Sequence, residues 1–90
     1  MEKSIHTPEH ERLCRLLKAR RVYLGLLQAD VCERLEVNRG FVSKYETGER
    51  RLDVIELRQV CEALDTNLID FLSEFEAGRI PPADAGRGLN

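Results

Sequence analysis

The chain has 90 residues and a formal net charge of −2, and 33% of its residues are charged. This length allows a single domain with a modest core. It contains no apolar run near the ~20 residues that span a bilayer, and its first residues lack the apolar core of a signal peptide. These features exclude a membrane span, and we expect a cytoplasmic protein.

The charges are unevenly distributed along the chain. Residues 38–51 carry four basic and two acidic residues, a local charge of +2, whereas residues 53–76 carry seven acidic residues and one arginine, a local charge of −6. A basic middle segment with an acidic C-terminal half is compatible with binding a polyanion through the middle segment, despite the negative total.

Cysteine and histidine spacing gives no metal-site signature. The cysteines are Cys14, Cys32 and Cys61, an odd number at spacings that match no zinc pattern. Cys32 and Cys61 fall at apolar helical positions, so we expect buried, reduced thiols. His6 and His10 are four residues apart without a third ligand. We expect solvent-exposed histidines at a helix end, with no metal and no cofactor.

The first predicted element is a helix that follows a disordered lead over residues 1–7. Thr7 is a typical N-cap, Pro8 suits the first helical position, and Glu9 is an acid near the positive helix end. Leucines supply an apolar stripe to about Leu24, and Gly25 ends the helix.

Two short helices are predicted next, joined by a tight turn. The first covers about residues 28–35 and is followed by Glu36 in the turn. Asn38 is the expected N-cap of the second helix, which Gly48 ends. Val37 before this cap and Val42 four positions into the helix form a hydrophobic staple that fixes the entry angle.

Two further helices complete the predicted domain, which covers residues 8–76. Asp53 caps a helix over about residues 54–64, and Asn67 caps a helix over about residues 68–76. Residues 77–90 carry glycine and proline without a helical period and are expected to form a flexible tail. The apolar positions of the 54–64 helix are Ile55, Leu57, Val60, Cys61 and Leu64.

Residues 28–47 have the apolar skeleton of a helix-turn-helix. Val31, Cys32 and Leu35 share one face of the first short helix, and Val42 and Tyr45 share one face of the second. The other face of the second helix is polar, and we interpret it as entering the major groove of DNA. Its outward residues are Arg39, Ser43 and Lys44.

The order of these signals resembles the lambda-repressor-like, or xenobiotic-response-element (XRE), family. The matching motifs are Gly25-Leu26-x-Gln28, Val37-Asn38-Arg39, Val42-Ser43-Lys44-Tyr45-Glu46-x-Gly48-Glu49-Arg50 and Leu57-x-x-Val60-x-x-Ala63-Leu64. The resemblance implies a compact, all-α, five-helix DNA-binding domain. It also implies a transcriptional regulator, usually a homodimer on a near-palindromic operator.

The resemblance also assigns roles to matching positions. Gln28 would contact a phosphate and brace a recognition side chain, and Arg21 with Glu46 would form a buried ion pair between helices one and three. Arg39, Gly40, Ser43 and Lys44 occupy base-facing positions, and Thr47, Arg50 and Arg51 would meet phosphate. The expected DNA-facing set is Gln28, Asn38, Arg39, Gly40, Phe41, Ser43, Lys44, Thr47, Arg50 and Arg51.

Three positions depart from the family pattern. Leu27 stands where Ser or Thr usually caps helix two, and Glu36 stands where glycine usually takes a left-handed turn, each at a cost of ~1 kcal/mol. Gly40 costs up to ~1 kcal/mol within a helix and has no side chain to read a base. It leaves room for the backbone or Phe41 to approach a thymine methyl group.

Several side chains have two readings. Arg39 can bond guanine in two places or contact phosphate, and Lys44 can contact either. One of Arg50 and Arg51 is expected at phosphate and the other paired with Glu49 or Asp53. Phe41 either packs or contacts a base methyl. Tyr45 is expected in the core with its hydroxyl at the rim, rather than as a stacking platform.

Apolar residues nearly encircle the last helix, which predicts a homodimer interface there. The residues are Ile69, Phe71, Leu72 and Phe75. The function we expect is therefore a homodimeric, sequence-specific DNA-binding regulator at the bacterial or phage nucleoid, with repression the commonest outcome. The alternative is an antitoxin-like or adaptor module whose acidic C-terminal half binds a basic protein. No nucleophile with an activating base and no phosphate loop can be assembled, so no enzyme is expected.

Overall fold

The computed structural model describes residues 7–78 and has five helices. These are α1 (Pro8–Tyr23), α2 (Gln28–Leu35), α3 (Gly40–Thr47), α4 (Val54–Ala63) and α5 (Leu68–Glu76). No strand occurs between residues 7 and 78, so the predicted all-α class with five helices is confirmed. The expected lead and tail lie outside the described residues, apart from Thr7, Ala77 and Gly78.

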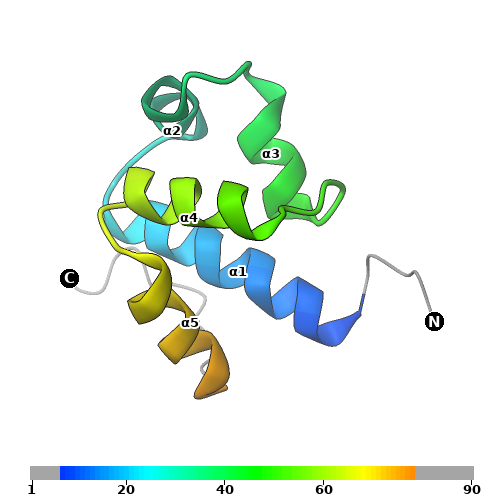
Figure 1. Cartoon of the computed structure of the whole chain (residues 1–90). Helices are drawn as coiled ribbons and strands as arrows, with labels where there is room; N and C mark the ends of the chain where they lie inside the picture. Colours follow the sequence, from blue (N-terminus) through cyan, green and yellow to red (C-terminus); the bar gives the residue numbers. More distant parts are fainter. Residues whose placement is uncertain (1–6, 79–90) are drawn as a thin grey trace.

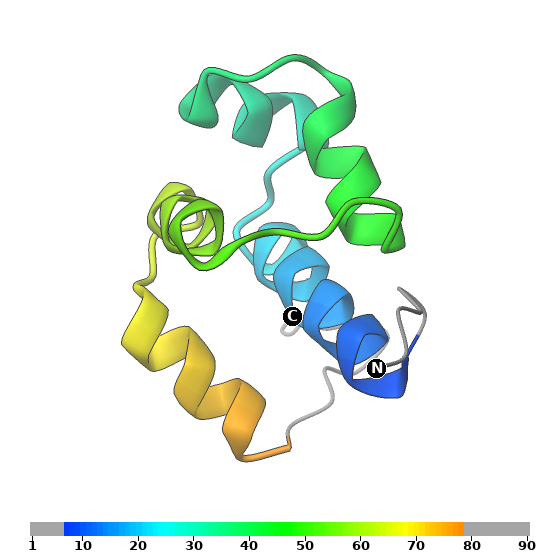
Figure 2. The ribbon, with the colours of Figure 1, turned by 45° about the vertical axis from the view of Figure 1, so that its right-hand side comes forward.

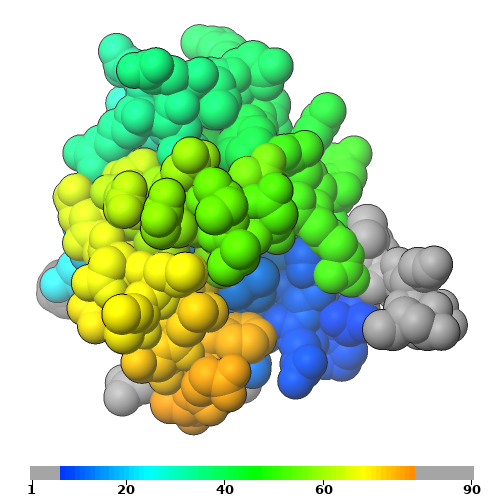
Figure 3. Space-filling model, viewed as in Figure 1, coloured from blue at the N-terminus to red at the C-terminus, as the bar shows by residue number. Residues whose placement is uncertain are grey.

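The helix-turn-helix forms one end of the molecule. α2 and α3 lie next to each other at this end, and α5 lies at the opposite end (Figure 1, Figure 2). α1 runs between the two ends and packs on both α3 and α5. α4 and α5 cover much of α1 on the face that Figure 3 presents. α1 and α4 therefore form the support on which α2 and α3 are mounted.

The core joins all five helices through side chains that are nearly inaccessible to solvent. α1 contributes Leu17, α2 contributes Val31, and α5 contributes Phe71. Aliphatic and aromatic burial of this kind is the main stabilising term of a small domain. The largest fully buried side chains are Tyr45, Leu17, Leu64, Val31, Val42, Val60 and Cys61.

Three predicted N-caps are confirmed by their hydrogen bonds. The Thr7 hydroxyl accepts from the His10 backbone N–H at 3.1 Å, and the Asn67 side chain accepts from Asp70 N–H at 2.8 Å. Asp53 forms a reciprocal capping box with Glu56, at 2.7 and 2.9 Å. Each cap satisfies a backbone donor that the helix leaves unpaired, so these starts are fixed locally.

The predicted side-chain cap at Asn38 is wrong. α3 begins at Gly40, Arg39 occupies its cap position, and no side-chain capping hydrogen bond is formed. Arg39 already has helical backbone angles (φ −61°, ψ −32°), and the Asn38 carbonyl accepts from Phe41 N–H at 3.2 Å. Asn38 therefore supplies its backbone, rather than its side chain, to the start of the recognition helix.

Two side chains lie in environments other than those expected. Ile55 was placed with the apolar stripe of α4 but is 52% exposed, because it falls off the three- and four-residue spacing of Leu57, Val60, Cys61 and Leu64. His10 was expected in solvent and is 9% exposed. Its ring packs against Gly48, which has no side chain to keep it away, and its Nε2 lies 3.7 Å from Cys14 Sγ.

Candidate nucleic-acid interface

α3 has one buried and one outward face. Val42 and Tyr45 are 0% and 1% exposed and anchor the helix to the core. Arg39 and Lys44 are exposed, and Ser43 is half-buried. The N-cap residue and one residue within α3 therefore carry solvent-accessible cations, and α3 itself lies at one end of the molecule (Figure 2). An exposed guanidinium and ammonium on one helix suit phosphate oxygens and guanine edges.

The turn between α2 and α3 is held by short-range bonds. Glu36 adopts a left-handed conformation with φ 58°, as expected for a position where glycine is usual. Val37 N–H donates to Cys32 O at 3.1 Å, and the Cys32 thiol donates to Arg39 O at 3.4 Å. The thiol therefore ties α2 directly to the first residue of the recognition segment.

α2 begins without a side-chain N-cap, as expected from the presence of Leu27. This residue is the N-cap and makes no side-chain capping bond. Asp30 compensates in part, because its carboxylate accepts from the Leu27 N–H at 2.8 Å. The acid also lies in the first turn, where it complements the positive end of the helix.

The predicted ion pair between Arg21 and Glu46 is present and buried. Arg21 Nε and Nη2 donate to the two carboxylate oxygens at 2.6 and 3.1 Å, and the side chains are 11% and 2% exposed. Arg21 also donates to Leu26 O at 2.8 Å. The Gln28 amide donates to Glu46 at 2.9 Å, so it braces the recognition helix through Glu46. Its phosphate contact stays a prediction.

Arg50 is turned toward the protein. Its guanidinium pairs with Glu56 and its Cζ lies 4.7 Å from the centre of the Phe41 ring. The expected carboxylate partners, Glu49 and Asp53, are therefore wrong for Arg50. Arg51 is exposed, and we retain it as the expected phosphate contact.

Phe41 packs within the domain. It is half-buried against the core, and its ring meets Tyr45 edge-on at 5.8 Å with an interplanar angle of 80°. Tyr45 lies in the core as expected, but its hydroxyl is buried rather than at the rim and has no hydrogen-bond partner in the described chain. Burial raises the pKa of this phenol.

The remaining DNA-facing candidates differ in accessibility. Asn38 and Thr47 are exposed, and the Thr47 hydroxyl donates to Lys44 O at 3.1 Å. A Cβ at Gly40 would lie 3.7 Å from Lys44 Cε, an ordinary contact. The monomer therefore does not require glycine at this position.

The residues expected at a dimer interface do not share one environment. Ile69 is 77% exposed, whereas Phe71 is 4% exposed and belongs to the core. Leu72 and Phe75 are half-buried, and the Arg12 guanidinium covers the Phe75 ring at 4.1 Å. Including Phe71 in the interface was wrong, because its side chain is already used inside the monomer.

The three cysteines are buried and free. Burial was expected for Cys32 and Cys61 and is also found for Cys14. Burial raises the pKa of Cys61 to about 11 and also raises that of Cys14. Both thiols are therefore neutral near pH 7 and poor nucleophiles. Residues 7–78 bring together no group of three His, Cys, Asp or Glu side chains suited to a metal ion.

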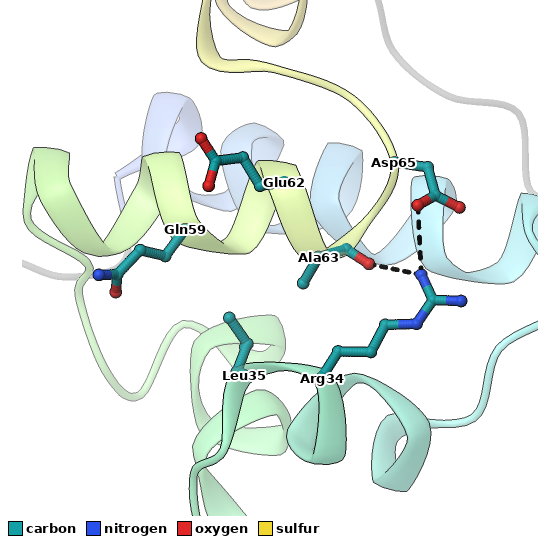
Figure 4. A pocket seen from close by; sticks show the side chains of 6 residues that line it. All are labelled: Arg34, Leu35, Gln59, Glu62, Ala63 and Asp65. Atoms are coloured by element: carbon teal, nitrogen blue, oxygen red, sulfur yellow. Dashed lines mark hydrogen bonds and ion pairs between the residues drawn. The ribbon is translucent and has the colours of Figure 1, made fainter.

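A surface hollow of about 600 Å³ lies between α2 and α4 (Figure 4). Arg34 borders it, donating to Ala63 O at 2.8 Å and pairing with Asp65 at 3.4 Å. Its lining brings no nucleophile next to a base. The lining residues are Arg34, Leu35, Gln59, Glu62, Ala63 and Asp65.

Comparison with known proteins places the chain in a family. A family model described as a helix-turn-helix domain matches residues 12–70. An XRE-family like protein from Pseudomonas syringae pv. tomato is 40% identical, with a TM-score of 0.71 over 82% of this chain and 90% of that one. No curated protein sequence matches the chain.

Two other solved structures share the fold. The clp gene regulator ClgR from Corynebacterium glutamicum is 26% identical, with a TM-score of 0.70 over 80% of this chain and 77% of that one. The restriction-modification controller protein C.Esp1396I, solved as a tetramer with its natural 35-base-pair operator, is 18% identical. Its TM-score is 0.74 over 80% of this chain and 95% of that one, a likeness of fold alone.

No helix between residues 7 and 78 is both long and apolar enough to cross a bilayer. The matched segment, residues 12–70, contains both helices of the helix-turn-helix. The Pseudomonas protein shares 40% sequence identity and the same fold. The chain belongs to the XRE-type helix-turn-helix family of DNA-binding transcriptional regulators.

Proposed function

We propose that the protein is a sequence-specific regulator that binds a near-palindromic operator as a homodimer and represses transcription by occluding a promoter at the nucleoid. The observation that carries this proposal is the outward placement of Arg39 and Lys44 on a helix whose other face is buried. A helix presented in this way fits the major groove, and two copies would occupy successive grooves.

Base reading is assigned first to Arg39. Its planar guanidinium can bond guanine O6 and N7 together, worth ~1–3 kcal/mol of discrimination. Lys44 lies further along the same outward face and supplies a point charge for guanine or phosphate. Thr47 and Arg51 lie beyond it at the end of α3 and in the loop, where phosphate contacts would fix the register.

The homodimer is assigned to the exposed surface of α5. Ile69 is 77% exposed, and a large aliphatic side chain with this exposure is a natural anchor for a second copy. Ile69→Glu should leave the monomer folded and shift sedimentation at micromolar concentration toward the monomer. Val54→Glu is a matched control, since Val54 is 61% exposed on another helix. Equal sedimentation of both variants and the wild type would remove α5 from the interface.

Selection of bound duplexes from a random pool tests the DNA-binding proposal. An inverted repeat of one half-site should be enriched, and binding should weaken with salt at a log–log slope near −0.9 per phosphate neutralised. Arg39→Ala should relax preference at one base pair of each half-site, whereas Lys18→Ala, an exposed cation of α1, should not. A pool without an enriched half-site, together with a shallow salt slope, would favour the adaptor alternative.

A further inference from the structure

Arg50 is held by the protein on two sides. Its Nη2 pairs with a Glu56 carboxylate oxygen, and its Cζ lies 4.7 Å above the Phe41 ring. Its backbone N–H donates to Lys44 O at 3.1 Å and so closes the end of α3. A side chain reaching for DNA would have to leave both Glu56 and the ring.

Glu56 uses its two carboxylate oxygens for different tasks. Oε1 accepts from the Asp53 N–H at 2.9 Å and completes the capping box of α4. Oε2 accepts from Arg50. Glu56 therefore fixes Arg50 relative to the start of α4, which is itself rigidly capped.

Phe41 connects Arg50 to the recognition helix. It belongs to the first turn of α3, next to Gly40 and close to Arg39. Its ring makes an edge-on contact with the ring of Tyr45, which is 1% exposed. A guanidinium over this ring restrains the N-terminal turn of α3, the part that would enter the groove first.

We infer that Arg50 and Glu56 act as a positioning pair, which sets the orientation of the recognition helix through Phe41, and that Arg50 is not a phosphate contact. The inference rests on the proposed function, because it concerns how α3 is presented to DNA. The competing arrangement is a switch in which Glu56 stands in for a phosphate and releases Arg50 when DNA arrives.

Glu56→Gln separates the two arrangements. Glutamine can still accept the Asp53 N–H and close the capping box, so the helix start is kept, but the charge that holds Arg50 is lost. Removing a negative charge should by itself tighten binding to DNA. A positioning pair instead predicts weaker binding to the selected operator, by about two- to fivefold, the range of a partly exposed ion pair.

Arg50 variants complete the experiment. Arg50→Gln should weaken operator binding by a similar factor with an unchanged salt slope, and the double variant should be no weaker than Arg50→Gln. Arg51→Gln is the comparator, since loss of a phosphate contact should make the slope shallower by about 0.9 per protomer. Preference for the operator over a mismatched duplex should fall in both Arg50→Gln and Glu56→Gln.

Arg50→Lys keeps the experiment decisive if Arg50→Gln folds poorly. An ammonium retains the charge for phosphate but loses the planar stack on Phe41. A positioning role therefore predicts weaker binding and a reduced preference for the operator, although less so than in Arg50→Gln because the ammonium can still pair with Glu56. A phosphate role predicts nearly wild-type affinity. Circular dichroism of every variant verifies the fold.

The outcomes separate the inference from the proposed function. Tighter, more salt-dependent binding by Glu56→Gln, with a slope about 0.9 shallower in Arg50→Gln, would overturn the positioning pair and leave the regulator intact. Wild-type protein without any sequence preference would instead refute the proposed function, and the inference with it.

Discussion

Glu46→Gln tests the contact that fixes the recognition helix to the rest of the domain. The carboxylate is 2% exposed and accepts three hydrogen bonds, two from Arg21 and one from Gln28, between 2.6 and 3.1 Å. The substitution preserves shape but leaves the buried Arg21 guanidinium without a counter-charge. It also turns an amide NH₂ toward groups that donate rather than accept.

The expected cost is large for a domain of this size. Breaking a buried pair by removing one partner costs about 3–5 kcal/mol, and roughly 70 residues have about 4–11 kcal/mol of stability in total. Each kcal/mol lowers Tm by about 4–8 °C in a small domain. Glu46→Gln should therefore lower Tm by about 12 °C or more.

Thermal and urea unfolding followed by circular dichroism measure this loss. Glu49→Gln is the matched control, because Glu49 is exposed and such substitutions usually change stability by less than about 0.5 kcal/mol. Replacing the pair together, as Arg21→Met with Glu46→Leu, should restore much of the stability since no charge is stranded. A loss below about 1 kcal/mol in Glu46→Gln would refute the reasoning, because a stranded buried charge costs more than that.

Three further predictions use the same unfolding measurements. Gly40→Ala should raise the free energy of unfolding by up to about 1 kcal/mol, since its Cβ meets only Lys44 Cε at 3.7 Å; destabilisation would mean that α3 needs glycine here. Tyr45→Phe removes a buried hydroxyl without a partner in the described chain, and should be neutral or stabilising by about 1 kcal/mol; a clear loss would indicate a hydrogen bond to that hydroxyl. Burial raises the pKa of Cys61 from 9.0 to about 11, so the unfolded chain loses this proton first, and the thiol's contribution to stability is complete below pH 9 and lost as pH rises toward 11. Urea melts of wild type and Cys61→Ala across this interval should converge as pH rises, and parallel curves would contradict the assignment.

The helix boundaries were largely predictable because their signals are local. Thr7, Asp53 and Asn67 each accept a hydrogen bond from a backbone N–H three residues later. Residue type and local sequence therefore suffice to predict these caps. The prediction of Asn38 as an N-cap was wrong because Arg39 already has helical backbone angles. The Asn38 side chain therefore lies outside the capping geometry. The error of placing Ile55 on the apolar face of α4 was avoidable, since its two-residue spacing from Leu57 does not fit a helical stripe.

The arginine partners were not predictable in the same way. The ion pair between Arg21 and Glu46 was predicted from a family resemblance. The two residues are 25 positions apart, and no local sequence signal predicts their contact. One of Arg50 and Arg51 was expected to pair with Glu49 or Asp53, whereas the fold pairs Arg50 with Glu56 and places it over the Phe41 ring. His10 became buried because α3 ends in a glycine next to it. These contacts are set by helix packing, which local propensity does not describe.

The last turns of α4 and α5 contain no basic residue, yet their terminal carbonyls are capped from elsewhere. Arg34 bonds Ala63 O, Arg20 bonds Leu64 O and Arg12 bonds Phe75 O, each at 2.8 Å. α1 and α2 thus supply the favourable charge that these helices lack in their own sequence. A fragment comprising α4 and α5 alone would consequently lose its end caps along with its packing surface. Folding of the five helices should be all-or-none, with no autonomous C-terminal unit.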